Sequence, residues 1–318
     1  MIVYVVKNPV LLRIFNRPEK VAVVMEVLRK VRPRELYLVG DGPRPDRGEA
    51  ERALVNQART VATDVDWDCE IHVKFYEDNV GGPTAGFEGI SWFFCNVDKG
   101  IVLEDDNVPT LSFFRFCDEL LELYREDERV GCITGNNFQS RKIGGASHYF
   151  SKYSHCWGWA SWSNSWAGCT LEPEFWRELK RSRQWMEWLP DSVERSYWDG
   201  IFDALSSGSK VHWDYAWMLW LWKRGALIAT PNSNLVTNIG FDESAQNTTN
   251  PGHPLANLPV QSLDEVIYPA EVVLDQEADR SAFDFVFGGR WYRFPLSWLR
   301  WPRRATSYLL RRFLWKMT

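Results

Sequence analysis

Three adjacent acids, Glu104, Asp105 and Asp106, follow a short apolar run at 100–103. Three neighbouring negative charges repel one another, so holding them at a buried strand end costs free energy unless a cation compensates. Carboxylate oxygens suit Mg²⁺ or Mn²⁺, and such ions commonly bridge to the phosphates of a substrate. An acidic turn at the start of a helix would explain the same residues, because acids favour that end of the helix dipole. The triplet by itself leaves both interpretations open.

A further candidate carboxylate is Asp214, which lies in an aromatic stretch at 213–222. If this stretch is helical, Asp214 shares a face with Trp217, Met218 and Leu221. A carboxylate on such an apolar wall is partly desolvated, which raises its pKa towards the range of a general base. The alternative is that Asp214 caps the helix.

The common glycine-rich motifs for binding phosphate are missing from the chain. It contains no GxGxxG and no GxxxxGK[ST], and it also lacks HExxH, GxSxG and a Cys/His metal spacing. These absences argue against a dinucleotide-dependent enzyme and a P-loop ATPase. An acidic metal site without a glycine-rich loop remains.

The first 135 residues contain the elements that would position these groups. Apolar runs predict strands at 10–15, 35–39, 69–75, 100–103 and 130–134, and amphipathic patterns predict helices at 18–30, 48–63, 86–95 and 111–125. This alternation predicts an α/β fold with a doubly wound, mainly parallel central sheet flanked by helices. Ligands bind such sheets at the carboxyl ends of the strands. Asp41 and the acidic triplet both follow predicted strands, so we expect them in one cleft.

The rest of the chain is less regular and rich in tryptophan. Most of the 18 tryptophans lie between Trp157 and Trp222, with helices expected around 171–189 and 214–223 and a loosely structured connector at 256–289. Tryptophan rings pack in cores, stack on sugars or anchor in membrane interfaces. For Trp157 and Trp159 the sequence leaves both core packing and sugar stacking open.

Composition bounds the class of protein. The 318 residues are 45% apolar and 25% charged, a composition that excludes disorder. The net charge of −5 argues against binding of nucleic acid through overall charge attraction. Six cysteines without a CxxC pair are expected to be reduced and mostly buried. No 18-residue apolar stretch is present, and the N-terminal run lacks the features of a signal peptide.

The segment 290–318 differs from the acidic remainder of the chain. It carries eight Arg or Lys residues and no acid, and tryptophans alternate with the arginines. A cationic segment with aromatic anchors can lie in the headgroup layer of an anionic membrane. A helix packed on the domain, or a contact between copies of the chain, would use the same residues. We expect membrane association, while the acidic body argues against nucleic acid as a partner.

Five short segments, in colinear order over residues 10–248, resemble nucleotide-sugar glycosyltransferases of the GT-A fold, particularly bacterial relatives of N-acetylglucosaminyltransferase I. The segments are Ile14-Phe15-Asn16-Arg17-Pro18, Leu38-Val39-Gly40-Asp41-Gly42, Val102-Leu103-Glu104-Asp105-Asp106, His155-Cys156-Trp157-Gly158-Trp159-Ala160-Ser161-Trp162 and Trp213-Asp214-Tyr215-Ala216-Trp217. Asn232 and the stretch Asn238-Ile239-Gly240-Phe241 also resemble the family. The acidic triplet would then be the family's variant of the DxD motif.

The resemblance implies a role for each of these residues. Asp106 would bind Mn²⁺ or Mg²⁺ and Asp214 would be the catalytic base. The nucleotide or donor sugar would be contacted by Phe15, Asn16, Arg17, Asp41, Glu104 and Asp105. Trp157, Trp159 and Trp217 would stack on the acceptor or sugar. Relatives often carry a metal-site His after the NIGF segment, where this chain has Asn247, with His253 six residues later.

The sequence therefore predicts a metal-dependent, inverting glycosyltransferase of the hexosyl- or N-acetylhexosaminyltransferase type. A UDP-sugar is the expected donor, and a glycan or lipid-linked glycan is the expected acceptor, at the cytoplasmic face of a membrane where surface polysaccharide is assembled. Residues 1–135 would bind the donor, 136–255 the acceptor within the same domain, and 256–318 would form a connector and membrane-associating tail. The alternatives are a non-catalytic, membrane-associated glycan-binding protein and a sugar nucleotidyltransferase, although FNRPEK stands where the latter expects a glycine-rich basic loop.

Overall fold

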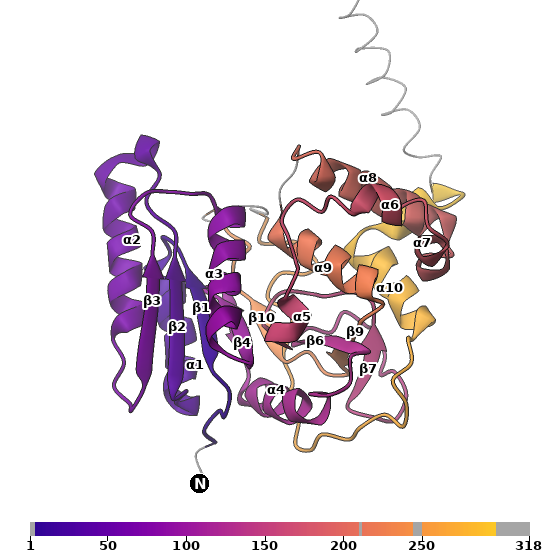
Figure 1. Ribbon diagram of the computed structural model, residues 1–318. Coiled ribbons are helices and arrows are strands. Elements are labelled where there is room, and N and C mark those ends of the chain that lie inside the picture. Colours follow the sequence, from indigo (N-terminus) through magenta and orange to yellow (C-terminus); the bar gives the residue numbers. More distant parts are fainter. Residues whose placement is uncertain (1–3, 210–211, 244–249, 297–318) are drawn as a thin grey trace, which may run out of the picture.

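A central sheet of eight strands runs through the computed structural model, which describes residues 4–209, 212–243 and 250–296 (Figure 1). In spatial order the strands are β3 (Glu70–Phe75), β2 (Glu35–Gly40), β1 (Val10–Ile14), β4 (Lys99–Glu104), β8 (Trp159–Trp162), β6 (Val130–Thr134), β9 (Leu227–Pro231) and β7 (His148–Ser151). A small second sheet pairs β5 (Asn107–Pro109) with β10 (Val236–Asn238).

Most neighbours in the large sheet are parallel. Strand β1 pairs in parallel with β2 and β4, β2 with β3, and β6 with β9, while β8 and β7 run antiparallel to their neighbours. Parallel neighbours need crossover connections, which here are helices on both faces of the sheet. The predicted α/β class with a mainly parallel, helix-flanked sheet is confirmed.

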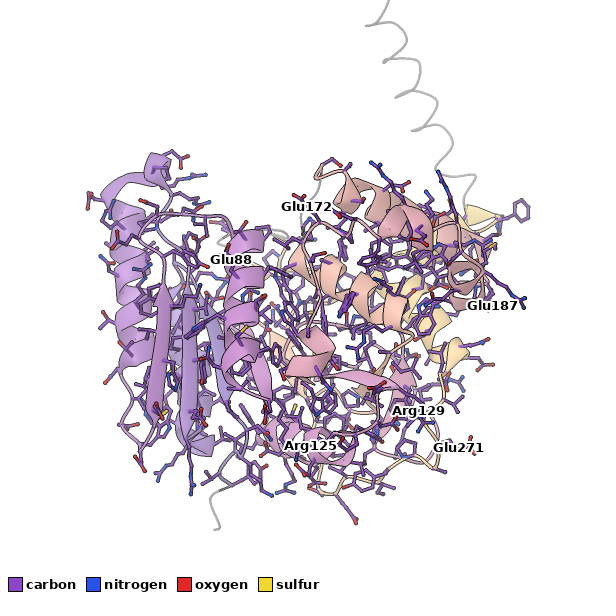
Figure 2. The ribbon with its side chains drawn as sticks, viewed as in Figure 1. Glu88, Arg125, Arg129, Glu172, Glu187 and Glu271 are labelled. Atoms are coloured by element: carbon purple, nitrogen blue, oxygen red, sulfur yellow. The ribbon has the colours of Figure 1, made fainter. Side chains whose placement is uncertain are left out.

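The helices form two layers that cover the two faces of the sheet. They are α1 (Pro18–Val31), α2 (Gly48–Thr63), α3 (Gly82–Asn96), α4 (Leu111–Leu123), α5 (Ser163–Trp166), α6 (Trp176–Leu179), α7 (Arg183–Trp188), α8 (Ser192–Ser206), α9 (Trp213–Arg224) and α10 (Gln276–Val286), with short 3₁₀ helices at Pro45–Arg47 and Gly289–Tyr292. One core joins α1, α2 and α4 to one face, and a second core joins α3, α8 and α9 to the other. Side chains fill the space between strands and helices (Figure 2).

Local sequence explains where these helices begin. Pro18 opens α1, since a proline lacks only an N–H group that the first turn of a helix leaves unpaired. Thr110 caps α4 by accepting a hydrogen bond from the N–H of Phe113. In the predicted helix at 171–189, Ser182 accepts a hydrogen bond from the N–H of Trp185 and starts a new helix. That prediction is therefore wrong in form, because two short helices, α6 and α7, replace one.

The sequence predicted the first 135 residues closely, and the nine elements expected there are confirmed within a few residues at their ends. It missed α8, the late strands β7 to β10, and α10, which lies inside the expected connector. Of the strands after residue 135, β7, β8 and β9 complete the same large sheet, whereas β10 pairs with β5. Within the described ranges, no helix combines the length and apolarity needed to cross a membrane.

Candidate functional site

A cavity of about 90 Å³ lies at the carboxyl ends of β1, β2 and β4. Its lining consists of Arg13, Ile14, Phe15, Arg17, Val39, Asp41, Gly82, Ala85, Gly86, Glu104 and Asp105. Five of the predicted donor-site residues are thus brought together from three separate segments. Asn16 is tied elsewhere, because its side-chain amide donates to Glu51 Oε1 on α2 at 3.1 Å.

The guanidinium of Arg17 lies between Asp105 and Asp106. Its Nη1 donates to Asp106 Oδ2 at 2.9 Å and its Nε to Asp105 Oδ2 at 3.3 Å, while Nη2 also bonds Asp105 Oδ1. The three side chains are 14%, 4% and 11% exposed, respectively. Burial by itself lowers the pKa of Arg17, but the two carboxylates raise it overall, so the guanidinium stays charged.

Asp106 is held by the second sheet as well. Its Oδ1 accepts hydrogen bonds from the amides of Asn107 at 2.7 Å and Asn238 at 3.3 Å, residues that face each other across β5 and β10. A Cβ at position 240 would overlap Asp106 Oδ2 and lie 2.7 Å from its Cγ, so only glycine permits this approach. The NIGF segment therefore positions Asp106 through Asn238 and Gly240.

Arg13 is a site residue that the sequence interpretation missed. It pairs in register with Glu104 across β1 and β4, and their side chains form an ion pair. Its guanidinium lies 4.9 Å from the ring centre of Trp213, and a Cβ at Gly86 would lie 2.8 Å from Arg13 Cζ. The sequence did contain a signal for Arg13, because it is a charged residue within an apolar strand. A buried charge requires a partner of opposite charge.

The carboxyl groups that line the cavity have pKa values above their ordinary range. Burial raises the pKa of Glu104 to about 7, against the opposing charge of Arg13. Burial likewise raises the pKa of Asp105 to about 6, against Arg17. The pKa of Asp41 is raised by burial too, although its Oδ1 accepts backbone N–H bonds from Gly42 at 2.8 Å and Val80 at 2.9 Å. Raised carboxyl pKa values at a strand-end cleft are typical of binding and catalytic sites.

Asp214 lies in the first turn of α9 outside the cavity lining, and its neighbour Trp213 lies against Arg13, which does line the cavity. The alternative that Asp214 caps the helix is wrong, because His212 occupies the N-cap position and no side chain caps the helix by a hydrogen bond. Burial raises the pKa of Asp214, and the charges of His212 and Arg13 partly oppose that rise. Arg13 thus links the cavity floor at Glu104 to the start of α9.

The tryptophans divide between core and surface. Trp159 and Trp217 are 0% exposed, and their ring centres lie 5.8 Å apart within the core. Surrounding rings cover them, so the sugar stacking expected of these two residues is wrong for the chain as folded here. Trp157 is only half-buried and packs edge-on against Phe138 and Phe241. Of the three predicted stacking residues, only Trp157 keeps an accessible ring.

The residues present fit a cation that is shared with substrate phosphates better than one held by protein alone. Asp106 offers the hard oxygen ligand that Mg²⁺ and Mn²⁺ take, and one or two carboxylates suffice when phosphates supply the other ligands. In the described ranges, no three His, Cys, Asp or Glu side chains gather to hold a metal. His253 stacks on Phe241 and its Nδ1 accepts the N–H of Leu255 at 3.2 Å, while Asn247 lies outside the described residues.

Comparisons with known proteins add little beyond this geometry. No known family and no curated protein matches the chain. Among solved structures, mouse xyloside xylosyltransferase 1 is 10% identical, with 69% of this chain and 83% of that one covered at a TM-score of 0.34. The 4-diphosphocytidyl-2C-methyl-D-erythritol synthase of Anaerococcus prevotii is 6% identical, with 70% and 88% covered at 0.34. HddC from Yersinia pseudotuberculosis is 10% identical, with 50% and 78% covered at 0.30. At these TM-scores the likenesses carry no conclusion about activity.

Proposed function

We propose that this chain is an inverting glycosyltransferase that moves a sugar from a nucleoside-diphosphate sugar to a hydroxyl group of a glycan acceptor. The observation that carries the proposal is the convergence of Arg13 and Arg17 with Glu104 and Asp105 in one cavity at the strand carboxyl ends. Guanidinium groups match the geometry of phosphate oxygens, and the acidic groups match sugar and ribose hydroxyls.

The nucleoside end of the donor would lie towards Asp41 and Phe15. Asp41 lines the cavity and is 6% exposed, and its Oδ2 accepts the amide of Asn79 at 3.0 Å. A carboxylate in this position suits a base N–H or a ribose hydroxyl. The Phe15 ring, with the Arg44 guanidinium 5.6 Å from its centre, offers a flat apolar face for a base. A UDP-sugar is the donor proposed here.

The reaction needs a base on the side opposite the leaving diphosphate. Asp214, with its raised pKa and its place beside the cavity, would accept the proton of the acceptor hydroxyl. The acceptor oxygen then bonds to the anomeric carbon as the bond from that carbon to the diphosphate oxygen breaks. Arg13 and Arg17 would stabilise the negative charge that develops on the diphosphate. When bound at Asp106, a divalent cation would supply further neutralisation of the leaving group.

A binding experiment tests the proposal first. A ligand that binds only the folded state raises the melting temperature by mass action. We expect UDP with Mn²⁺ to raise the melting temperature of the full chain, and Asp41→Asn to reduce the rise. If GDP, CMP or ATP is effective instead, the enzyme class stays and the donor changes. If no nucleotide has an effect, the glycosyltransferase proposal fails and the glycan-binding alternative replaces it.

The acceptor is proposed to be lipid-linked and presented at an anionic membrane surface. Within the described residues, Trp291 is 42% exposed and Phe294 78% exposed, next to Arg290. The rest of the basic tail, 297–318, lies outside the described residues. We expect the full chain to sediment with vesicles that contain phosphatidylglycerol, but not with purely zwitterionic vesicles. Equal sedimentation with both, or with neither, would contradict the membrane proposal.

A further inference from the structure

Arg17 holds the place between Asp105 and Asp106 that a cation would otherwise take. Its side chain is only 14% exposed, and the three contacts to the two carboxylates use three of its five N–H groups. The remaining N–H groups belong to a side chain that lines the cavity. Arg17 can therefore bond a phosphate oxygen without first losing Asp105.

Both carboxylate oxygens of Asp106 already have a hydrogen-bond donor while Arg17 is in place. Arg17 donates a hydrogen bond to Oδ2, and the amides of Asn107 and Asn238 donate to Oδ1. An ion that arrives alone would have to displace Arg17 from Asp106 and leave part of a nearly buried guanidinium unpaired. Unpaired buried charge is costly, so this route is disfavoured.

A diphosphate changes this balance. If a phosphate oxygen takes over the Nη1 contact, Arg17 exchanges one charge-assisted hydrogen bond for another and stays paired. Asp106 Oδ2 is then released at the moment when phosphate oxygens, which an ion of this kind prefers as co-ligands, are also present.

We propose that Arg17 is a latch that makes the nucleoside diphosphate and the divalent cation bind together. An ion alone meets the closed latch, and a diphosphate alone would open it but leave Asp106 Oδ2 without a counter-ion, so the two ligands bind more favourably together than separately. Because binding free energies are linked, each ligand must raise the affinity of the other by the same factor. The inference rests on the proposed function for its nucleotide and goes beyond it in assigning the coupling to Arg17.

The test is the thermal unfolding of the full chain in chelator, in Mn²⁺ alone, in UDP alone and in both. For the wild type we expect a negligible shift with Mn²⁺ alone and a shift with both ligands that exceeds the sum of the separate shifts. In Arg17→Gln, Asp105 and Asp106 lose their counter-ion, so Mn²⁺ alone is expected to raise the melting temperature by about 2 °C or more. An Arg17→Gln variant that responds to Mn²⁺ alone no more than the wild type does would overturn the latch.

Two further variants isolate the cause. Arg29→Gln removes the same charge from a half-buried arginine on α1, which pairs with Asp66 at 2.8 Å far from the cavity lining, and should leave the wild-type pattern unchanged. Arg17→Gln combined with Asp106→Asn should lose the response to Mn²⁺ alone. If the double variant keeps that response, the ion does not bind at Asp106 and the latch is overturned.

The wild-type measurements decide the matter even if Arg17→Gln does not fold. A shift with Mn²⁺ alone as large as the shift with both ligands overturns the latch and leaves the glycosyltransferase proposal intact. Additive shifts overturn it in the same way. Absence of any nucleotide shift, with or without Mn²⁺, is the separate outcome in which the proposed function itself fails.

Discussion

Arg13 on β1 and Glu104 on β4 stand next to each other in the register of two parallel strands, and their side chains form an ion pair at the floor of the candidate donor cavity. The same guanidinium lies against the ring of Trp213, one residue before Asp214. A single side chain therefore connects the predicted donor site to the predicted catalytic base, although the three segments are far apart in the sequence.

This pair should be coupled energetically. Removing Arg13 alone, as in Arg13→Gln, leaves Glu104 without its partner, and we expect the free energy of unfolding to fall by about 1–3 kcal/mol. A double-mutant cycle with Glu104→Gln, measured by urea unfolding, checks this. Additive single effects would show that the two side chains do not depend on each other.

Asp214→Asn tests the catalytic base. The amide has almost the shape of the carboxylate but cannot accept the proton, so we expect transfer to fall by about 10²–10⁴-fold. The shift in melting temperature caused by the nucleotide should stay at its wild-type value. Release of UDP from the donor sugar in the presence of acceptor measures the first effect. Wild-type turnover in this variant would remove Asp214 from the mechanism.

Gly240→Ala tests the approach of the NIGF segment to Asp106. The added Cβ would overlap Oδ2 of Asp106, so the segment must move away, at a cost of about 1–3 kcal/mol in stability. We also expect the joint effect of UDP and Mn²⁺ on the melting temperature to be lost. Gly145→Ala is the matched control, because no heavy atom lies within 4 Å of a Cβ at that position. Equal effects of the two substitutions would contradict the proposed contact.

The buried side chain of His148 should make the stability of the fold sensitive to acid. It is 0% exposed, and burial lowers its pKa from 6.5 to about 4. The unfolded chain then takes up this proton at a higher pH than the folded chain does. The neutral His148 gives its full contribution to stability above pH 6.5. This contribution is lost as the pH falls through about 4, and the loss in the free energy of unfolding amounts to about 3 kcal/mol.

Urea unfolding between pH 4 and pH 7 measures this slope. We expect His148→Gln to lose less stability than the wild type over that interval, because the glutamine does not titrate. The same substitution at His253, which lies half-buried in a loop, serves as the control. A variant that keeps the full wild-type slope would show that other groups cause the acid sensitivity.

Alanine substitutions of Trp159 and Trp157 should distinguish a residue needed for stability from one that contacts a ligand. Trp159→Ala empties a fully buried position and is expected to cost about 3–5 kcal/mol, whereas Trp157→Ala should cost less because its ring is only half-buried. If Trp157 contacts the acceptor, its alanine variant raises the KM for acceptor and leaves nucleotide binding unchanged. Comparable losses of stability in both variants would contradict the division into core and surface rings.

The sequence alone determined the first half of the fold and the edge of the sheet at which the candidate site lies. Alternating apolar runs and helix starts such as Pro18 are local signals, and the rule that ligands bind at strand carboxyl ends turned them into one cleft. Asp41 and Asp105 were expected in that cleft because each follows a predicted strand, and both line the cavity. Beyond residue 135 the same reasoning weakened for the strands, because every residue of β7, β8 and β9 is buried and their apolar pattern therefore does not alternate.

Only the tertiary structure decided which partner each charged group has. Arg13 carries no motif, and its role comes from the register of β1 against β4. Asp106 accepts hydrogen bonds from Arg17, Asn107 and Asn238. These bonds bring together three distant segments of the chain. Burial of Trp159 and Trp217 likewise depends on the packing of rings from α3, α5 and α9, and the sequence did not predict α5. The physical reason is that periodicity and capping act over a few residues, whereas ion pairing and burial depend on contacts between residues about a hundred positions apart.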